Sequence, residues 1–258
     1  MKQIEFASNA VKILANDQFV IGLAAGGSLL SGELDDYSDI DLVLVTKEKI
    51  SDKKDRMLEY ANKLGNVLTA FTGEHVAEPR LLICLYDNPL LHVDIKFVTL
   101  DEFKNRIEDP YILLDNDGHL KDIIESTASA WPHPDYQWIE DRFWTFIHYG
   151  LLKIGRGEYF EALDFLSFLR FIVLGPLLHT KHGNLPRGVR KVETQLSEND
   201  FQKLKGTIAI HDKQSLLNAV SKAILIYKDL RRELFDPTII FHHQAEKRVM
   251  EFYEKTSM

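Results

Sequence analysis

The first half of the chain alternates helix-like and strand-like patterns of apolar residues. Apolar positions recur every three or four residues over residues 2–15 and 52–64, which predicts two amphipathic helices. Short apolar runs and alternating patterns predict strands over residues 19–25, 39–45, 67–71, 80–86 and 91–98. These elements predict an α/β (α+β) domain in which a mixed sheet packs against helices.

The same pattern indicates which side chains face the core and where one pair of strands turns. The expected inward positions are Ile4, Val11 and Leu14 in the first helix and Met57, Tyr60, Ala61 and Leu64 in the second. Between the last two strands, Asp87-Asn88-Pro89 is typical of a turn, because Asn and Asp bond to their own backbone and proline fixes φ. We therefore expect an antiparallel hairpin there.

The second half has a different pattern, which begins near residue 131. Long helical patterns replace the strand-like ones, over roughly residues 136–155, 158–180, 197–206, 212–235 and 239–256. Residues 131–134 include two prolines and are typical of a linker, because proline lacks a backbone donor and interrupts regular structure. We therefore expect two domains: residues 1–130 form the α/β domain, and residues 131–258 form an all-α helical domain.

Composition is that of an ordinary globular protein. Of the 258 residues, 45% are hydrophobic and 27% are charged. The single cysteine, Cys84, lies in an apolar run and is expected to be a buried, inert thiol. The longest apolar stretch, residues 165–178, is interrupted by Arg170 and Pro176, so no membrane span is predicted. The first residues lack the pattern of a signal peptide, and we expect a cytoplasmic protein.

Charge is unevenly distributed along the chain. Residues 1–130 hold 13 Lys and Arg against 23 Asp and Glu, a net charge of −10, whereas residues 131–258 carry +2. Binding to a nucleic-acid backbone needs a basic surface, so nucleic acid is not the expected partner. An acidic first half suits a cationic or neutral small substrate instead.

Two aspartates two residues apart stand out within the predicted sheet. Asp39 and Asp41 share one face of their strand, because successive strand residues alternate, while Ile40 and Leu42 point to the core. Two carboxylates at this spacing repel each other unless a cation lies between them. Alternating charges can also be solvated positions on an exposed face, so the pair alone does not decide between a metal site and a polar surface.

A third carboxylate lies on a later strand. Apolar and polar residues alternate over residues 92–97, so His92, Asp94 and Lys96 share one face. If this strand lies beside residues 39–45, Asp94 joins the two aspartates. Three carboxylates suit one or two Mg²⁺ ions, which prefer hard oxygen ligands. Lys96 either contacts phosphate or points into water.

A glycine-serine turn precedes the aspartates. Gly26, Gly27 and Ser28 end an apolar strand and open a helix. Glycine lets the backbone approach phosphate oxygens closely, and the N–H groups at a helix start, with the Ser28 hydroxyl, can donate to them. Together, the turn and the carboxylates supply what is needed to hold a metal-bound nucleoside triphosphate.

The order and spacing of these residues resemble those of a known superfamily. Gly27-Ser28 is followed, after ten residues, by Asp39 and Asp41 and later by Asp94 between two apolar residues. This order is similar to that of the nucleotidyltransferase superfamily related to DNA polymerase β. The resemblance makes a solvated polar surface the weaker interpretation of the aspartates.

Within that superfamily, the string over residues 27–42 is especially similar to the bacterial small-molecule and antibiotic nucleotidyltransferases. The motifs cover about residues 22–98, and the helical second half is compatible with the helical domain of such enzymes. The resemblance implies transfer of a nucleoside monophosphate, with AMP from ATP as the expected case, to a hydroxyl of a small-molecule acceptor. An aminoglycoside-like compound is one candidate acceptor, and pyrophosphate would be released.

The resemblance also implies roles for individual residues. The expected site residues are, for catalysis and metal binding, Asp39, Asp41 and Asp94 and, for the triphosphate, Gly27, Ser28 and Lys96. Two other functions stay open: transfer of AMP to a protein hydroxyl, as in toxin-neutralising members of the superfamily, and a non-catalytic nucleotide-binding module. The three carboxylates and the glycine-serine turn count against the last.

The helical half supplies further candidates, on the expectation that the active cleft lies between the two domains. Candidates for a general base are Glu140, Glu158, Glu161 and Asp164, and cations that could reach phosphates are Lys153, Arg156 and Arg170. Glu158 opens a helix, where stabilisation by the helix dipole is the preferred interpretation. Aromatic residues spaced like a buried helix face, and so expected in the core, are Trp138, Phe143, Trp144, Phe146 and Tyr149.

Overall fold

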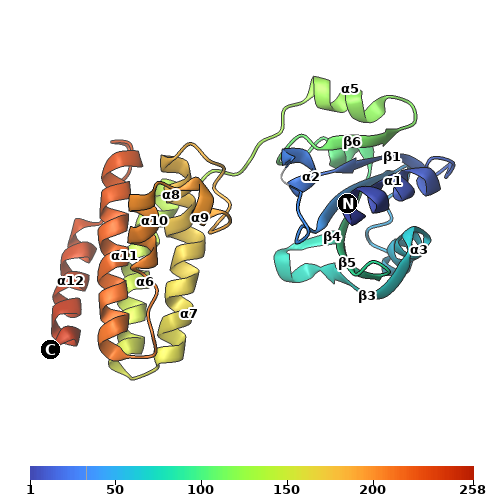
Figure 1. The fold of residues 1–258 in the computed structure, drawn as a ribbon. Coiled ribbons are helices and arrows are strands. Elements are labelled where there is room, and N and C mark those ends of the chain that lie inside the picture. Colours follow the sequence, from blue (N-terminus) through green and yellow to red (C-terminus); the bar gives the residue numbers. More distant parts are fainter. Residues whose placement is uncertain (33) are drawn as a thin grey trace. The chain divides into compact units, whose positions relative to one another are not determined.

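The structure of the chain is a computed structural model that describes residues 1–32 and 34–258. It forms two compact units, Met1–Trp131 and Pro132–Met258, and each is described by itself (Figure 1). The first contains a sheet and helices, and the second consists of helices and connecting loops. The predicted fold class is confirmed: an α/β (α+β) part with a mixed sheet is followed by an all-α part.

A six-stranded mixed sheet forms the centre of the first unit. Its strands are β1 (Val20–Ala25), β2 (Ile40–Thr46), β3 (Asn66–Gly73), β4 (Glu78–Asp87), β5 (Leu91–Val98) and β6 (Tyr111–Asp115). They lie in the order β3-β4-β5-β2-β1-β6, in which β2 and β5 are parallel and the other neighbours are antiparallel. The predicted strands and the β4–β5 hairpin are confirmed. The edge strand β6 was not predicted, because its apolar run is short.

Helices pack on both faces of this sheet. They are α1 (Lys2–Leu14), α2 (Gly27–Ser31), α3 (Lys54–Leu64), α4 (Leu100–Phe103) and α5 (His119–Ser126), with a 3-10 turn η1 (Glu74–Val76). Leu14 of α1 and Met57 of α3 belong to one core cluster with Leu42 of β2. Phe103 of α4 and Leu120 of α5 belong to a second cluster on the opposite face. All four inward residues predicted for α3 are buried.

The inward face of α1 differs from the prediction. Leu14 is buried as expected, but Ile4 is 49% exposed, and Gln3 is buried beside it in the sequence. The Gln3 side-chain amide donates to the backbone carbonyls of Asp35 (2.8 Å) and Ser38 (3.0 Å). Gln3 continues the buried stripe of Ala7, Ala10 and Leu14, so its amide lies on the inward face of α1, where it bonds to the loop.

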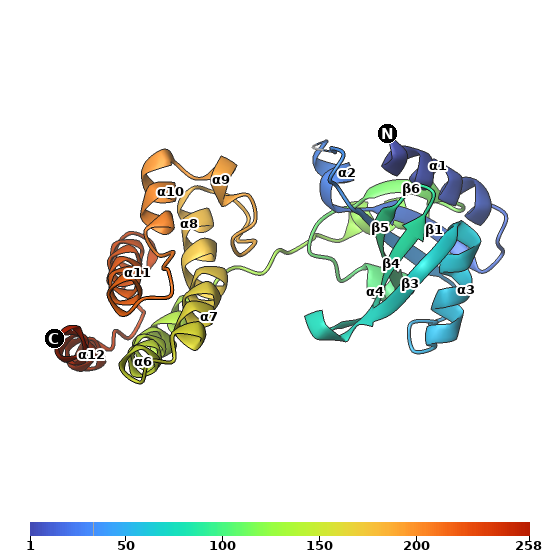
Figure 2. The same ribbon diagram turned by 60° about the horizontal axis from the view of Figure 1, so that its bottom comes forward.

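The second unit is a helical bundle. Its segments are α6 (Tyr136–Gly155), α7 (Tyr159–Leu169), the π-helical η2 (Arg170–Leu174), α8 (Gly175–Lys181), α9 (Val192–Gln195), α10 (Glu198–Lys205), α11 (Lys213–Leu234) and α12 (His243–Ser257). The helix α6 packs beside both α11 and α12, and Figure 2 looks almost along their axes. One large apolar cluster fills the space between the helices.

The aromatic residues of α6 are divided between core and surface. Phe143 and Trp144 are fully buried, and Phe146 packs partly buried against the same core. Trp138 and Tyr149, which were expected in the core, are 39% and 42% exposed. A helix presents a limited stripe to its neighbours, and aliphatic residues of α6 fill much of that stripe, so these two rings stay at its edges.

One stretch of the second unit, Tyr159–Lys181, is long and apolar enough to cross a membrane. Its mean hydropathy is 1.5, and 56% of the apolar window is buried inside the unit. Residues of α7, η2 and α8 contribute to the same apolar cluster as α6 and α11. Burial in the core of the bundle accounts for part of the hydropathy of this stretch, whereas Phe160, Phe168 and Phe171 are exposed.

Candidate active site

Asp41 and Asp94 lie opposite each other on the parallel strands β2 and β5. The register pairs Ile40 with Val93 and Asp41 with Asp94. Side chains at paired positions of neighbouring strands point to the same face of a sheet. The strand that carries Asp94 therefore lies beside the strand that follows Asp39, as the three-carboxylate hypothesis required.

Asp39 joins this pair at the start of β2. It precedes the first residue of the strand, so the alternation of extended backbone directs it to the face of Asp41. Burial raises the pKa of Asp94 above its ordinary value, and the negative charge of Asp39 raises it further. The carboxylates of Asp39 and Asp94 are thus close enough to interact.

Hydrogen bonds fix the loop that leads to Asp39. The Gln3 amide holds the carbonyls of Asp35 and Ser38 from the side of α1. Within the loop, the Ser38 hydroxyl and the backbone N–H of Tyr37 both donate to Oδ1 of Asp35, each at 2.9 Å. This side-chain-to-backbone turn, anchored to α1, positions Asp39 at the entry to β2.

The glycine-serine turn lies directly against Asp41. The backbone N–H of Gly26 donates to the carbonyl oxygen of Asp41 at 2.9 Å. Gly27 has a φ of +60°, and a Cβ built on it would lie 2.1 Å from Oδ2 of Asp41. Glycine is required at this position both for the left-handed backbone and for the close approach. The turn therefore brings Gly27 and Ser28, in the first turn of α2, to the aspartates.

His92 and Lys96 lie on either side of Asp94 along β5, and each has an acidic partner. The His92 Nε2 atom is 2.9 Å from Oδ1 of Asp94. The Lys96 Nζ atom is 2.7 Å from Oε2 of Glu78, at the start of β4. The structure thus places Lys96 in an ion pair that the sequence did not predict.

The same face of the sheet is polar at one end and apolar at the other. Val43 and Val45 continue β2 beyond Asp41, Val98 ends β5, and all three belong to or pack against the cluster that includes α4 and α5. At the polar end, the side chain of Asp94 is 21% exposed and that of His92 is 51% exposed. One strand face therefore serves both the core and the candidate site.

The donor set fits a divalent cation, because carboxylates that share one face raise one another's pKa and a cation relieves their repulsion. In the part of the chain that the structure describes, however, no group of three or more His, Cys, Asp or Glu side chains is drawn together as a metal cluster. Asp94 instead contacts His92, and Asp41 lies against Gly27. Binding of Mg²⁺ by Asp41, Asp94 and Asp39 stays a prediction.

The first unit matches a known domain family over nearly its whole length. Residues 7–127 match the family described as nucleotidyltransferase domain. The first unit belongs to this family. The superfamily resemblance of the motifs is thereby confirmed: the chain contains a nucleotidyltransferase domain, the domain of enzymes that transfer nucleoside monophosphates. Every residue predicted for the site lies inside the matched range.

Solved structures also resemble this chain. A crystal structure of an aminoglycoside 6-adenyltransferase from Bacillus subtilis is 16% identical to it, and the match covers 96% of each chain with a TM-score of 0.42. Similarity at this level does not identify the acceptor. No curated protein sequence matches the chain.

In the second unit, Glu140 is a core residue. Its side chain is fully buried, and its carboxylate accepts hydrogen bonds from the Tyr227 hydroxyl and from the backbone N–H of His242 (3.0 Å). An Arg231 nitrogen lies 3.3 Å from the same carboxylate. Because all of these groups are inside the bundle, Glu140 is removed from the candidates for a general base.

Four other charged candidates form one surface cluster between α6 and α7. The Lys153 Nζ atom lies 2.9 Å from Glu158 and 3.1 Å from Glu161. Hydrogen bonds to these two carboxylates raise the pKa of Lys153. Glu158 is also the N-cap residue of α7, but its side chain makes no capping hydrogen bond, so its stabilisation of the helix start stays a prediction. Arg156 lies 3.8 Å from Glu158 and belongs to the same cluster.

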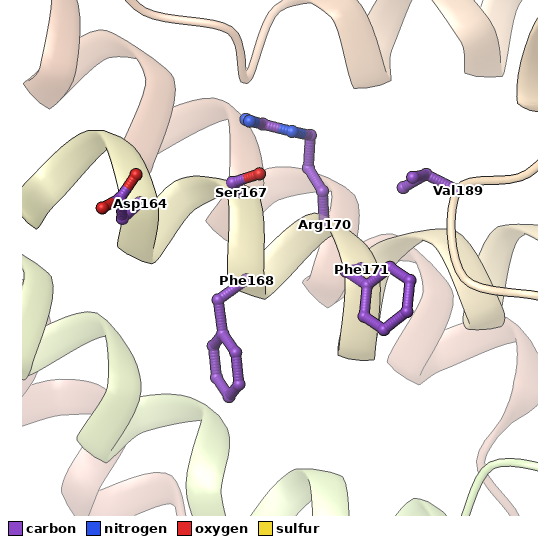
Figure 3. A pocket seen from close by; sticks show the side chains of 6 residues that line it. All are labelled: Asp164, Ser167, Phe168, Arg170, Phe171 and Val189. Carbon is purple, nitrogen blue, oxygen red and sulfur yellow. The ribbon is translucent and has the colours of Figure 1, made fainter. Parts of the chain in front are cut away.

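Asp164 and Arg170 line a pocket of about 410 Å³ that the second unit builds alone (Figure 3). Its other lining residues are Ser167, Phe168, Phe171 and Val189. The Arg170 guanidinium donates to the carbonyl oxygen of Thr207 at 2.7 Å, so it is tied to the chain that follows α10. Figure 3 shows the Phe168 ring pointing away from that guanidinium. The structure thus gives Arg170 a structural partner.

Residues that support the site escaped the sequence analysis. Gln3 lies on a helix far from the motifs in sequence, and Glu78 and Arg80 lie outside every motif. Their roles come from contacts made when α1 and β4 pack against other elements. No local pattern distinguishes them from ordinary polar residues.

Proposed function

We propose that the chain transfers a nucleoside monophosphate, AMP from ATP in the expected case, to a hydroxyl of a small-molecule acceptor, with Mg²⁺ as the required cation and pyrophosphate as the second product. The observation that carries this proposal is the pairing of Asp41 with Asp94, next to the Gly27 turn, inside a nucleotidyltransferase domain. The net charge of −10 over residues 1–130 suits a cationic acceptor, so an aminoglycoside-like compound is a candidate.

In this proposal the two sets of site residues act on different parts of the nucleotide. Asp39, Asp41 and Asp94 hold Mg²⁺, which offsets the charge of the triphosphate and of the leaving pyrophosphate. The backbone at Gly27 and the hydroxyl of Ser28 donate to phosphate oxygens. A cytoplasmic location, where ATP and Mg²⁺ are both available, belongs to the same proposal.

The chemical step is a displacement at the α-phosphorus. The acceptor oxygen forms a bond to this phosphorus while the bond to the bridging oxygen of the β-phosphate breaks, and pyrophosphate leaves. The acceptor hydroxyl must also lose its proton. Asp94 is the candidate proton acceptor, because a carboxylate at the site can accept the proton of the attacking hydroxyl.

The test is turnover by the full chain with ATP, Mg²⁺ and a panel of hydroxyl-bearing acceptors that includes cationic amino sugars, with pyrophosphate release as the measurement. Asp39→Asn and Asp41→Asn should each lower turnover at least about 100-fold, because each removes a charge that holds the cation. Asp101→Asn is the matched control, since that side chain is 90% exposed on α4. Unchanged turnover in Asp39→Asn or Asp41→Asn would show that the site is assigned wrongly.

Two experimental outcomes would contradict transfer to a small molecule and support another function. An increase equal to AMP in the intact mass of a protein, after incubation with ATP and cell extract, would make a protein hydroxyl the acceptor. Calorimetric binding of ATP without turnover on any acceptor would indicate a nucleotide-binding module instead.

A further inference from the structure

Lys96, the candidate phosphate contact on β5, is held by a carboxylate that is itself clamped. The Lys96 Nζ atom lies 2.7 Å from Oε2 of Glu78. Arg80 donates to both oxygens of Glu78, from Nε to Oε1 and from Nη2 to Oε2, each at 2.7 Å. A bidentate pair of this kind has a fixed planar geometry, so Glu78 offers Lys96 a stationary acceptor.

Arg80 is connected in turn to a helix start. Its Nη1 atom lies 3.8 Å from Oε1 of Glu102. Glu102 closes the capping box of α4, in which its carboxylate accepts from the backbone N–H of Thr99 at 3.0 Å. A chain of contacts therefore runs from α4 through Arg80 and Glu78 to Lys96, and each member is fixed by the next.

The contact with Glu78 leaves donors of the Lys96 ammonium available for an anion. Hydrogen bonds from Arg80 and Lys96 lower the pKa of Glu78 to about 2, so Glu78 is ionised throughout the neutral range. An ammonium group has three donors, and the contact with Glu78 uses one of them.

We propose that Glu78 is a positioning residue for the nucleotide: it holds the ammonium of Lys96, which is two residues from Asp94 on β5, and Arg80 holds Glu78. This inference rests on the proposed function, in which Lys96 contacts the triphosphate. A lysine side chain loses considerable rotamer freedom when it binds a ligand, and fixing it beforehand removes part of that cost. Glu78 therefore acts on the binding of the nucleotide rather than on the chemical step.

The test is a double-mutant cycle in the full chain. Glu78→Gln keeps the shape of the side chain and should raise the KM for ATP about three- to tenfold, with kcat nearly unchanged. Lys96→Met should raise the KM more, about ten- to fiftyfold, because the ammonium itself is lost. The double variant should bind ATP no more weakly than Lys96→Met alone, because Glu78 acts through Lys96.

Two further variants separate positioning from general effects. Arg80→Lys keeps the charge but loses the bidentate fork, and its KM should fall between those of the wild type and Glu78→Gln. Asp101→Asn breaks an exposed ion pair with Lys104 (2.7 Å) and should leave the KM unchanged. Thermal unfolding of each variant shows whether the fold is retained.

Three results would overturn the positioning role. The first is that Glu78→Gln raises the KM for ATP by the same factor in the wild type and in Lys96→Met. The second is that Glu78→Gln leaves the KM unchanged while Lys96→Met raises it. The third is an unchanged KM in Lys96→Met while Asp39→Asn abolishes turnover, which would leave the proposed function standing without this inference. If the wild type showed no turnover, ATP affinities from calorimetry would provide the same comparisons.

Discussion

Asp41 and Asp94 stand opposite each other on two parallel strands, although a helix and a two-stranded hairpin separate them in the chain. Parallel neighbours require such a crossover, and α3 with the β3–β4 pair provides it here. The distance between the two carboxylates therefore depends on how the whole sheet packs. Residues remote from the chemistry are expected to affect turnover for this reason.

Gly27 and Gly118 allow the close approach of the turn to Asp41 to be tested. Both have positive φ, +60° and +78°, so alanine should cost each about 1 kcal/mol of stability in the left-handed region. A Cβ at Gly27 would collide with Oδ2 of Asp41, whereas nothing lies within 4 Å of a Cβ at Gly118. The turnover of Gly27→Ala should therefore be at least about tenfold lower than that of Gly118→Ala. Equal turnover in the two variants would contradict the contact.

Gln3 should affect the site through the loop before Asp39. Gln3→Met keeps the size of the side chain but leaves the carbonyls of Asp35 and Ser38 without their donor, so the free energy of unfolding should fall by about 1–3 kcal/mol. Turnover measured well below the melting temperature should fall as well, because Asp39 is less well placed. Gln202→Met, at an exposed position, is the control. If Gln3→Met lost stability but kept full turnover, the loop would not be needed to position Asp39.

Glu140 is expected to support the fold and not the chemistry. Glu140→Gln removes the charge that faces Arg231 inside the bundle and should lower the free energy of unfolding by about 2–4 kcal/mol. At low temperature, where the variant stays folded, kcat should remain close to that of the wild type. Denaturant unfolding and turnover on the same sample give both quantities. A kcat that fell about 100-fold in folded protein would restore Glu140 as a general base.

Cys84 should be unreactive in the native chain. Burial raises the pKa of its thiol to about 12, and the thiolate is the reactive form. A thiol reagent at pH 8 should therefore label the native chain at least about 100-fold more slowly than the chain unfolded in denaturant. Because the unfolded thiol ionises near pH 8.5 and the folded one near 12, part of the stability should be lost as the pH rises between these values. Cys84→Ala should lose less stability than the wild type over that pH range. Equal losses in the two proteins would contradict the raised pKa of Cys84.

Patterns in the sequence correctly predicted those features that depend only on residues near one another in the chain. Alternation along β2 and β5 assigned Asp39, Asp41 and Asp94 to strand faces, because side chains of a strand point alternately to its two sides. Helical spacing identified the inward residues of α3, and turn chemistry identified the β4–β5 hairpin. The glycine-serine turn and the paired aspartates were enough to indicate a nucleotidyltransferase, the family that residues 7–127 match.

What remained was decided by contacts between elements distant in the sequence. The register that sets Asp41 against Asp94 exists only once β2 and β5 have paired, and no local pattern specifies it. Gln3 is buried on the stripe of Ala7, Ala10 and Leu14, and its bonds to the loop before Asp39 exist only once α1 has packed. The ion pair of Lys96 with Glu78 has the same origin, because charged partners on different strands become neighbours when the sheet forms.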